Sequence, residues 1–126
     1  MSYQDGAVIN AGTRQTTTII TDTDFINNTA IEGGVFSIQE ESVIKCHNCV
    51  FTNNFASVSG VIRVAENGYF EIYDSQINNN YASQSPISEL FNSAVMSIID
   101  NTTIYGNEAL AYNEIINEFN TTCDKL

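Results

Sequence analysis

The feature that most constrains this chain is an internal repeat with a period of about 26 residues. The segment Phe25–Ala30 returns at 51–56, 77–82 and 104–109, so the copies are evenly spaced except that the last comes one position late. Three positions keep their character in all four copies: a Phe or Ile, an Asn and an Ala. A fixed period of this length indicates a protein in which one structural unit stacks on the next.

Segments with apolar and polar residues in alternation recur in the same register. They lie at 34–38 and 43–46, at 60–64 and 69–72, and at 86–90 and 95–98. Alternation with a period of two predicts β-strands that bury one face. In the second segment of each unit the polar column holds Lys45, Glu71 and Ser97. We therefore expect Lys45 and Glu71, and likewise Arg63 and Glu89, to face each other across adjacent laps of the chain.

Short strands at a fixed period have a simple physical solution: the chain coils, and each residue lies about 4.8 Å above its counterpart one lap earlier. Antiparallel sandwiches also use short strands, but they have no reason to repeat side-chain identity at this spacing. The sequence therefore predicts an all-β parallel β-helix (β-solenoid) of about four to five coils of ~26 residues, with three parallel sheets.

The chain is expected to form one domain over residues 1–126 and to be a segment of a longer solenoid. Residues 110–126 repeat poorly and are predicted to be a weak last coil or a tail, in which residues 113–121 align with 85–93. Solenoid ends need protection from pairing with other chains. Since no amphipathic capping helix is evident at either end, the expected partners are neighbouring coils of the same protein or further copies of it.

Two short motifs resemble a known repeat. Gly33-Gly34-Val35-Phe36 is similar to G-G-A-[ILV], and Phe25-x-x-Asn28 and Phe51-x-x-Asn54 match F-x-x-N. Both motifs mark the repeat of the polymorphic outer-membrane proteins, and the resemblance covers roughly residues 5 to 110. It implies a right-handed coil, an extracellular or cell-surface location, and an adhesive or architectural role.

Two polar columns accompany the repeat. The first is expected to form an asparagine ladder in which stacked amides bond from lap to lap, with ligand binding as the alternative. It holds Asn28, Asn54, Asn80 and Asn107. The second is expected to form Asx turns, with Ca²⁺ held between stacked carboxylates as the alternative. It holds Asp22, Asn48, Asp74 and Asp100.

The segment Cys46-His47-Asn48-Cys49 contains a C-x-x-C pair, which is half of a common zinc site. Its His is the only histidine of the chain, and there is no second pair. Cys46 falls in an apolar column with Ile72 and Ile98, which favours core packing. Core packing, a local Cys46–Cys49 disulfide and metal binding remain open, and we expect no metal and no cofactor.

Three N-x-[ST] sequons occur, at Asn27, Asn101 and Asn120. Each is a candidate glycan acceptor if a eukaryotic host secretes the protein. Asn27 is expected to point outward beside the ladder, and Asn101 lies in the coil with an extra residue.

Charge excludes two classes of partner. Lys and Arg number 4 against 15 Asp and Glu, a net charge of −11. Nucleic acids and anionic membranes attract clustered basic residues, so neither is an expected partner. No segment has the roughly 18 consecutive apolar residues of a membrane span, and membrane insertion is not expected.

Catalysis is not expected either. Polyuronate lyases of similar architecture need cations near the substrate carboxylate, but Arg14, Lys45, Arg63 and Lys125 do not converge on one face. The leading hypothesis is a non-enzymatic extracellular or cell-surface structural or adhesive module, either assembling end to end in a filament or forming part of a larger surface protein. The alternative is a carbohydrate-binding or polysaccharide-cleaving domain, with Tyr69, Tyr73 and His47 as candidate contacts and glycans as partners.

Overall fold

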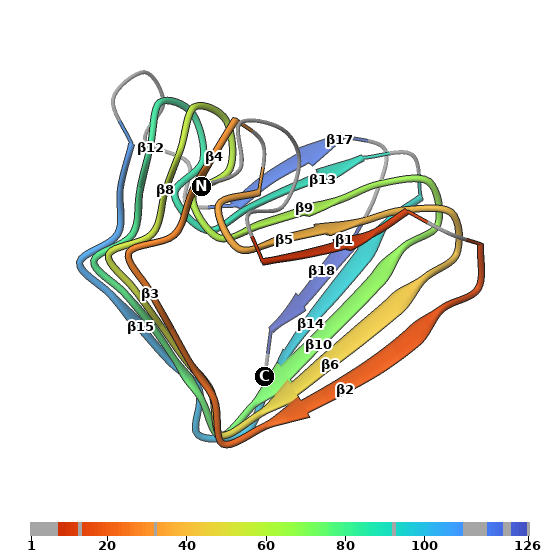
Figure 1. Cartoon of the computed structure of the whole chain (residues 1–126), viewed down its shortest axis with the longest axis horizontal. Coiled ribbons are helices and arrows are strands. Elements are labelled where there is room, and N and C mark those ends of the chain that lie inside the picture. The colour runs from red at the N-terminus through yellow and green to blue at the C-terminus, as the bar shows by residue number, and fades with distance from the viewer. Residues whose placement is uncertain are drawn as a thin grey trace.

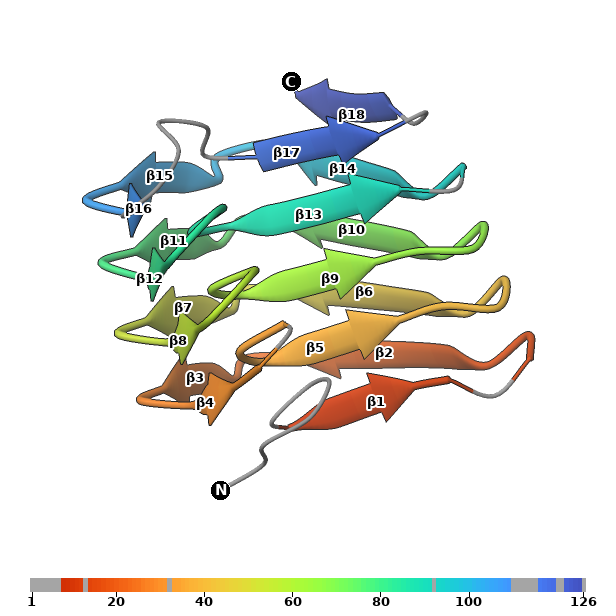
Figure 2. The ribbon, with the colours of Figure 1, turned by 90° about the horizontal axis from the view of Figure 1, so that it is seen from above.

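The computed structural model describes residues 8–12, 14–31, 33–91, 93–109, 116–119 and 122–125. Over these residues the chain is all-β and every strand pair is parallel (Figure 1). Seen with the N-terminal strands nearest the viewer, the chain runs clockwise as it recedes, so the coil is right-handed (Figures 1 and 2). The predicted right-handed parallel β-helix is confirmed.

Four sheets run along the coil, and each takes one strand from every lap. Sheet 1 contains β1 (Ile9–Ala11), β5 (Phe36–Ile38), β9 (Ile62–Val64), β13 (Ser88–Phe91) and β17 (Ile116–Phe119). Sheet 2 contains β2 (Thr17–Thr21), β6 (Val43–His47), β10 (Tyr69–Tyr73), β14 (Val95–Ile99) and β18 (Thr122–Lys125). Sheet 3 contains β3 (Asp24–Ile26), β7 (Val50–Thr52), β11 (Gln76–Asn78) and β15 (Thr103–Tyr105). Sheet 4 contains β4 (Thr29–Ala30), β8 (Phe55–Ala56), β12 (Tyr81–Ala82) and β16 (Glu108–Ala109).

One lap of four strands is called a rung here: rung 1 is β1–β4, rung 2 is β5–β8, rung 3 is β9–β12 and rung 4 is β13–β16. Figure 2 shows the rungs stacked in chain order, with β17 and β18 above rung 4. Equivalent residues are direct partners in the sheets: Phe25 pairs with Phe51, Phe51 with Ile77, and Ile77 with Ile104. The predicted register is therefore confirmed, including the extra residue before the last copy.

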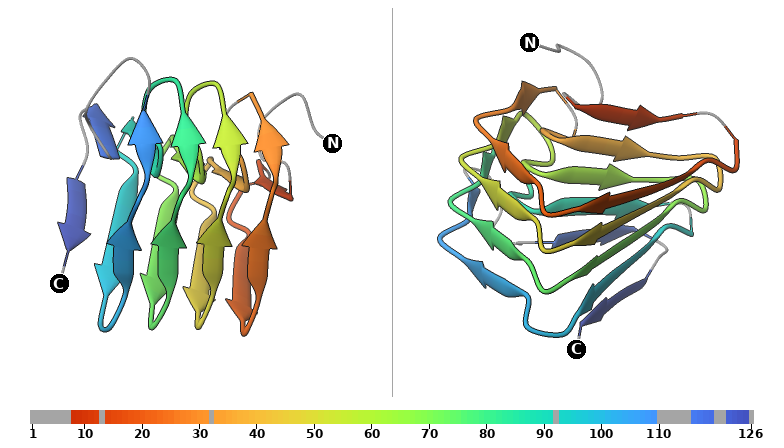
Figure 3. Two further views of the ribbon diagram at one scale, coloured as in Figure 1. Left: turned by 90° about the vertical axis from the view of Figure 1, so that its left-hand side faces the viewer. Right: turned by 60° about the horizontal axis from the view of Figure 1, so that its bottom comes forward.

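The prediction of three sheets is wrong, because a second corner divides what the sequence presents as one segment. Between β3 and β4 the chain turns at Asn27, which has a φ of 60°. The same corner occurs at Asn53, Asn79 and Gly106, whose φ values are 56°, 53° and 67°. Asn and Gly adopt this left-handed conformation more readily than other residues. The bend separates the short sheet 4 from sheet 3, as the two columns of arrows in Figure 3 (left) show.

The return from sheet 4 to sheet 1 explains the Gly-Gly motif. Gly33 has a φ of 58°, and Gly34 passes so close to the next rung that a Cβ would overlap the carbonyl oxygen of Gly60. Gly60 in turn lies against the carbonyl oxygen of Pro86. The first glycine is thus required by conformation and the second by close approach of two backbones.

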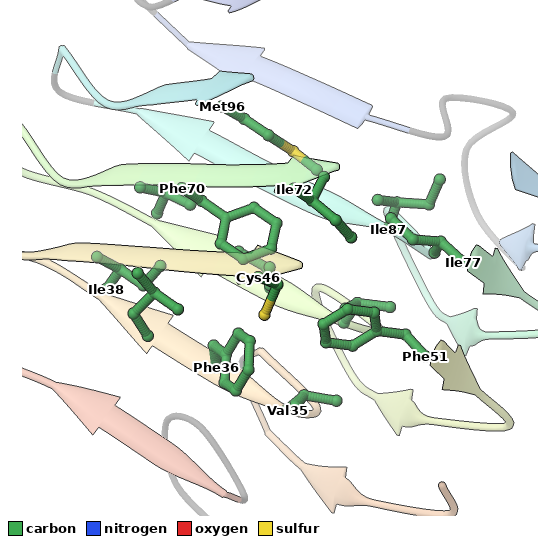
Figure 4. Close-up of a cluster of buried hydrophobic side chains, with 14 of the residues drawn as sticks. Val35, Phe36, Ile38, Cys46, Phe51, Phe70, Ile72, Ile77, Ile87 and Met96 are labelled. Carbon is green, nitrogen blue, oxygen red and sulfur yellow. The ribbon is translucent and has the colours of Figure 1, made fainter. Parts of the chain in front are cut away.

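The interior is filled by like residues stacked on like. Phe25 and Phe51 stack with ring centroids 4.9 Å apart, and Phe36 meets Phe51 edge to face at 5.6 Å. Phe36, Phe51 and Phe70 come from different strands but turn into the same interior, as Figure 4 shows. This continuous core runs along the axis and is the main source of stability.

Burial is incomplete at rung 1, which has a neighbouring rung on one side only among the described residues. The inward residues Ile44 and Cys46 of β6 are fully buried, whereas Thr18 and Ile20, their partners on β2, are half-buried. Four large apolar residues of the first lap are exposed: Val8, Ile19, Ile26 and Ile31. This lower edge of β1–β4 is called the open edge below.

At the other end, β17 pairs with β13 and β18 pairs with β14. Ile116 lies opposite Ser88, which is the register expected from the alignment of residues 113–121 with 85–93. Residues 116–119 and 122–125 therefore continue sheets 1 and 2 beyond rung 4.

Candidate functional surfaces

The Asn column forms the predicted ladder at the corner between sheets 3 and 4. Asn54 Nδ2 donates to Asn80 Oδ1 at 2.9 Å and to the carbonyl oxygen of Phe25 at 3.0 Å. Asn54 Oδ1 accepts from Asn28 Nδ2 at 2.9 Å and from the Asn28 backbone N–H at 3.0 Å. Asn80 repeats this pattern with Asn107 and Phe51. Because these bonds engage the buried amides of Asn54 and Asn80, the column acts as internal support, and ligand binding is not the favoured interpretation.

A second ladder, made of hydroxyl groups, lies at the corner between sheets 2 and 3. Ser75 Oγ donates to the carbonyl oxygen of Tyr73 at 2.8 Å and accepts from the Cys49 backbone N–H at 2.9 Å. Thr23 and Thr102 each donate their hydroxyl to a carbonyl just before the corner, at 2.8 and 2.9 Å. The sequence identifies these positions only as small residues at a turn. Their recurrence as Thr, Cys, Ser and Thr was the available signal.

The acidic column lies at this same corner. Asp22, Asn48 and Asp74 have φ values of 51°, 54° and 50°, so these residues turn the chain through their own backbones. The extra residue of rung 4 lies here too, since Asp100 and Asn101 both have a φ of 31°. The side chains bond between rungs: Asn48 Nδ2 donates to Asp22 Oδ1 at 2.7 Å, and Asn101 Nδ2 to Asp74 Oδ1 at 3.2 Å. These amide–carboxylate bonds support a structural role for the column.

Cys46 and Cys49 flank the corner that follows β6, and both are buried free thiols. The pKa of the Cys46 thiol is raised well above its ordinary value, because it shares a hydrogen bond with Cys49 and is buried. Cys49 occupies the hydroxyl ladder, and its Sγ lies 3.6 Å from the carbonyl oxygen of His47. Each cysteine thus fills the place that its column assigns, and the disulfide stays a prediction.

The outer face of sheet 2 holds the expected pairs between rungs. Lys45 Nζ lies 3.7 Å from Glu71 Oε2, as the register predicts. Arg63 and Glu89 are register partners in sheet 1. The rings of His47 and Tyr73 stack with centroids 4.6 Å apart and an interplanar angle of 14°. Each of these two rings therefore covers one face of the other, and a sugar ring needs such a face to stack on.

The remaining concave feature is a shallow, open depression of about 220 Å³ at the corner between sheets 3 and 4. It is lined by Asn79, Asn80, Tyr81, Gly106 and Glu108. Glu108 is its one carboxylate, whereas an inverting glycosidase needs two. Within the described ranges, no group of three or more His, Cys, Asp or Glu side chains is placed to hold a metal ion.

The three sequons have different positions in the fold. Asn27 and Asn101 lie in corners and are exposed. Asn120 lies outside the described residues.

Comparison with known proteins gives no relative. No protein-family model matches the sequence, and neither a curated protein nor a solved structure matches the chain. In the part of the chain that the structure describes, no helix has the length and hydropathy needed to cross a membrane.

Proposed function

We propose that this chain is a non-enzymatic structural or adhesive module of an extracellular or cell-surface protein. The observation that carries the proposal is how its polar side chains are used. The amides of Asn54 and Asn80 bond along the axis, Lys45 pairs with Glu71, and the ring of His47 stacks on Tyr73. These contacts join one rung to the next, which is what a rigid, extended scaffold requires.

The partners that suit this scaffold are further coils, either of the same protein or of a second copy. The open edge presents the free sides of β1 to β4 together with the exposed side chains of Ile19 and Ile26. An edge of this kind is a template for another strand. We therefore include end-to-end association in the proposal.

Self-association is tested by sedimentation velocity over a series of protein concentrations. Ile26→Lys places a charge beside the open edge, and Val50→Lys places the same charge on the inner strand β7 of the same sheet. We expect the mean particle mass of the wild type and of Val50→Lys to rise with concentration, and that of Ile26→Lys to rise less. A wild type that stays monomeric throughout would contradict association between copies.

The competing function is action on carbohydrate, suggested by Tyr69, Tyr73 and His47 on the outer face of sheet 2. Purified protein is incubated with a panel of neutral and acidic polysaccharides while new reducing ends and unsaturated uronates are measured, and a glycan array is probed in parallel. We expect no turnover. Release of reducing ends or unsaturated products, abolished by His47→Ala and Tyr73→Ala, would overturn the non-enzymatic proposal.

A further inference from the structure

Two sequons alternate between solvent and interior in the same way. In Asn27-Asn28-Thr29 the first residue is exposed, the second donates to the buried ladder, and the third is half-buried in the outward column of sheet 4. In Asn101-Thr102-Thr103 the outer two residues are exposed. The middle residue, Thr102, is half-buried in the hydroxyl ladder. In each case the acceptor amide reaches solvent while the middle residue holds the corner.

We propose that Asn27 and Asn101 are N-glycosylation sites of the folded protein, an inference that rests on the extracellular location in the proposed function. A glycan is bulky and hydrated, and it fits only where the acceptor side chain projects from the surface. Asn27 has this position at the corner between β3 and β4, and Asn101 at the corner between β14 and β15. Neither glycan displaces a member of the two ladders.

The chemistry needs an oligosaccharide carried on a lipid diphosphate. A bond forms between the amide Nδ2 and the anomeric carbon, the bond from that carbon to the diphosphate oxygen breaks, and the lipid diphosphate leaves with the electron pair. The amide releases one proton and keeps one hydrogen. At Asn101 that remaining hydrogen can still be donated to Asp74 Oδ1, now 3.2 Å from Nδ2.

The two sites border the same sheet at diagonally opposite points. Asn27 follows β3, the strand of sheet 3 in rung 1, and Asn101 precedes β15, its strand in rung 4. Glycans there would shield sheet 3 from both ends. Asn27 is also next to the open edge, where a glycan would hinder pairing with another chain.

The repeat supplies matched variants. Asn27→Gly removes the acceptor but keeps the corner, because Gly106 occupies the same column with a φ of 67°. Thr29→Val removes the hydroxyl with little change in shape. Phe55→Thr creates a new N-x-T sequon one rung away, with its acceptor at Asn53, where the corner has a φ of 56°. Thr29 already shows that threonine fits this outward column.

The experiment appends a secretory signal to the chain, expresses it in cultured mammalian cells with Asn120→Gln as background, and maps glycopeptides from medium and cells. We expect secreted protein with glycans at Asn27 and Asn101. We expect loss of the Asn27 glycan in Asn27→Gly and Thr29→Val, loss of the Asn101 glycan in Asn101→Gln, and a new glycan at Asn53 in Phe55→Thr.

Secreted protein without glycan at Asn27 or Asn101 would overturn the inference. Glycosylated chains retained in the cells, with only unmodified chains in the medium, would overturn it too, because the glycans would then be incompatible with the fold. Polysaccharide turnover or failure to associate would instead count against the proposed function and would leave the glycan map unchanged.

Discussion

Rungs 1 and 2 are built from nearly the same pattern but differ in burial. Phe51 in rung 2 is fully buried, while Phe25 in rung 1 retains 6% exposure; Ile44 and Cys46 are fully buried, while Thr18 and Ile20 are only half-buried. The difference is the neighbour, since rung 2 lies between two described rungs and rung 1 does not. In this architecture burial is thus supplied largely by the adjacent rung, and position along the axis decides what a residue contributes.

The largest expected effect comes from the aromatic stack. Phe51→Ala should lower the free energy of unfolding by about 3–5 kcal/mol, because it leaves a closed cavity. Phe25→Ala should cost roughly 1–2 kcal/mol less, because its space opens toward the open edge. Urea titration of both variants measures the difference, and equal losses would show that the end rung is as well packed as the inner one.

The ladder should show the same contrast. Asn54→Ala should cost about 2–3 kcal/mol, since it deprives Asn28 of its acceptor and the carbonyl oxygen of Phe25 of a donor. Asn28→Ala should cost about 1 kcal/mol, because Asn28 bonds to the next rung alone among the contacts described. Thermal and urea unfolding test the order, which a larger loss for Asn28→Ala would reverse.

A stabilising change is expected where rung 4 departs from rungs 2 and 3. Ser88 lies in the core column of Phe36 and Ile62, and its buried Oγ has no hydrogen-bond partner in the described structure. Ser88→Val should raise the free energy of unfolding by about 1 kcal/mol. Ser97→Val is the control, because its Oγ lies 3.3 Å from the Tyr69 hydroxyl and the change removes that bond. A loss of stability in Ser88→Val would show that its hydroxyl is needed.

The smallest expected effect is a pH dependence confined to rung 2. The pKa of Cys46 is raised in the folded state above its ordinary value of 9.0, so the folded chain keeps this proton when the unfolded chain loses it. Its contribution is complete below about pH 9 and declines as the pH rises further. Under reducing conditions, the stability of Cys46→Val/Cys49→Ser should therefore fall less between pH 9 and 10.5 than that of the wild type. Parallel profiles would contradict this origin.

A disulfide at the same corner is tested separately by thiol titration and mass spectrometry of protein isolated without reductant. The structure describes both thiols as free. Loss of both thiols together would support the disulfide prediction, whereas two titratable thiols on unfolding would contradict it.

The repeat predicted the coil, its register and the Asn ladder because each depends on one residue type that recurs at one spacing. The fourth sheet was missed because Asn27 and Asn28 read as one polar pair, although the first bends the backbone and the second enters the ladder. Gly106 in place of Asn27 was the sign that this column is selected by conformation. The hydroxyl ladder was missed for a related reason: Thr, Cys and Ser share a small size, and sequence alone does not show that Ser75 accepts from the backbone of Cys49.

The central claim is that residues one lap apart lie directly above one another in parallel strands. Nuclear Overhauser contacts in solution measure this most directly. The account predicts contacts at a constant separation of one lap, linking Phe25 to Phe51, Phe51 to Ile77 and Ile77 to Ile104. Contacts whose residue numbers instead add to a constant sum would reveal antiparallel hairpins and would contradict the coil.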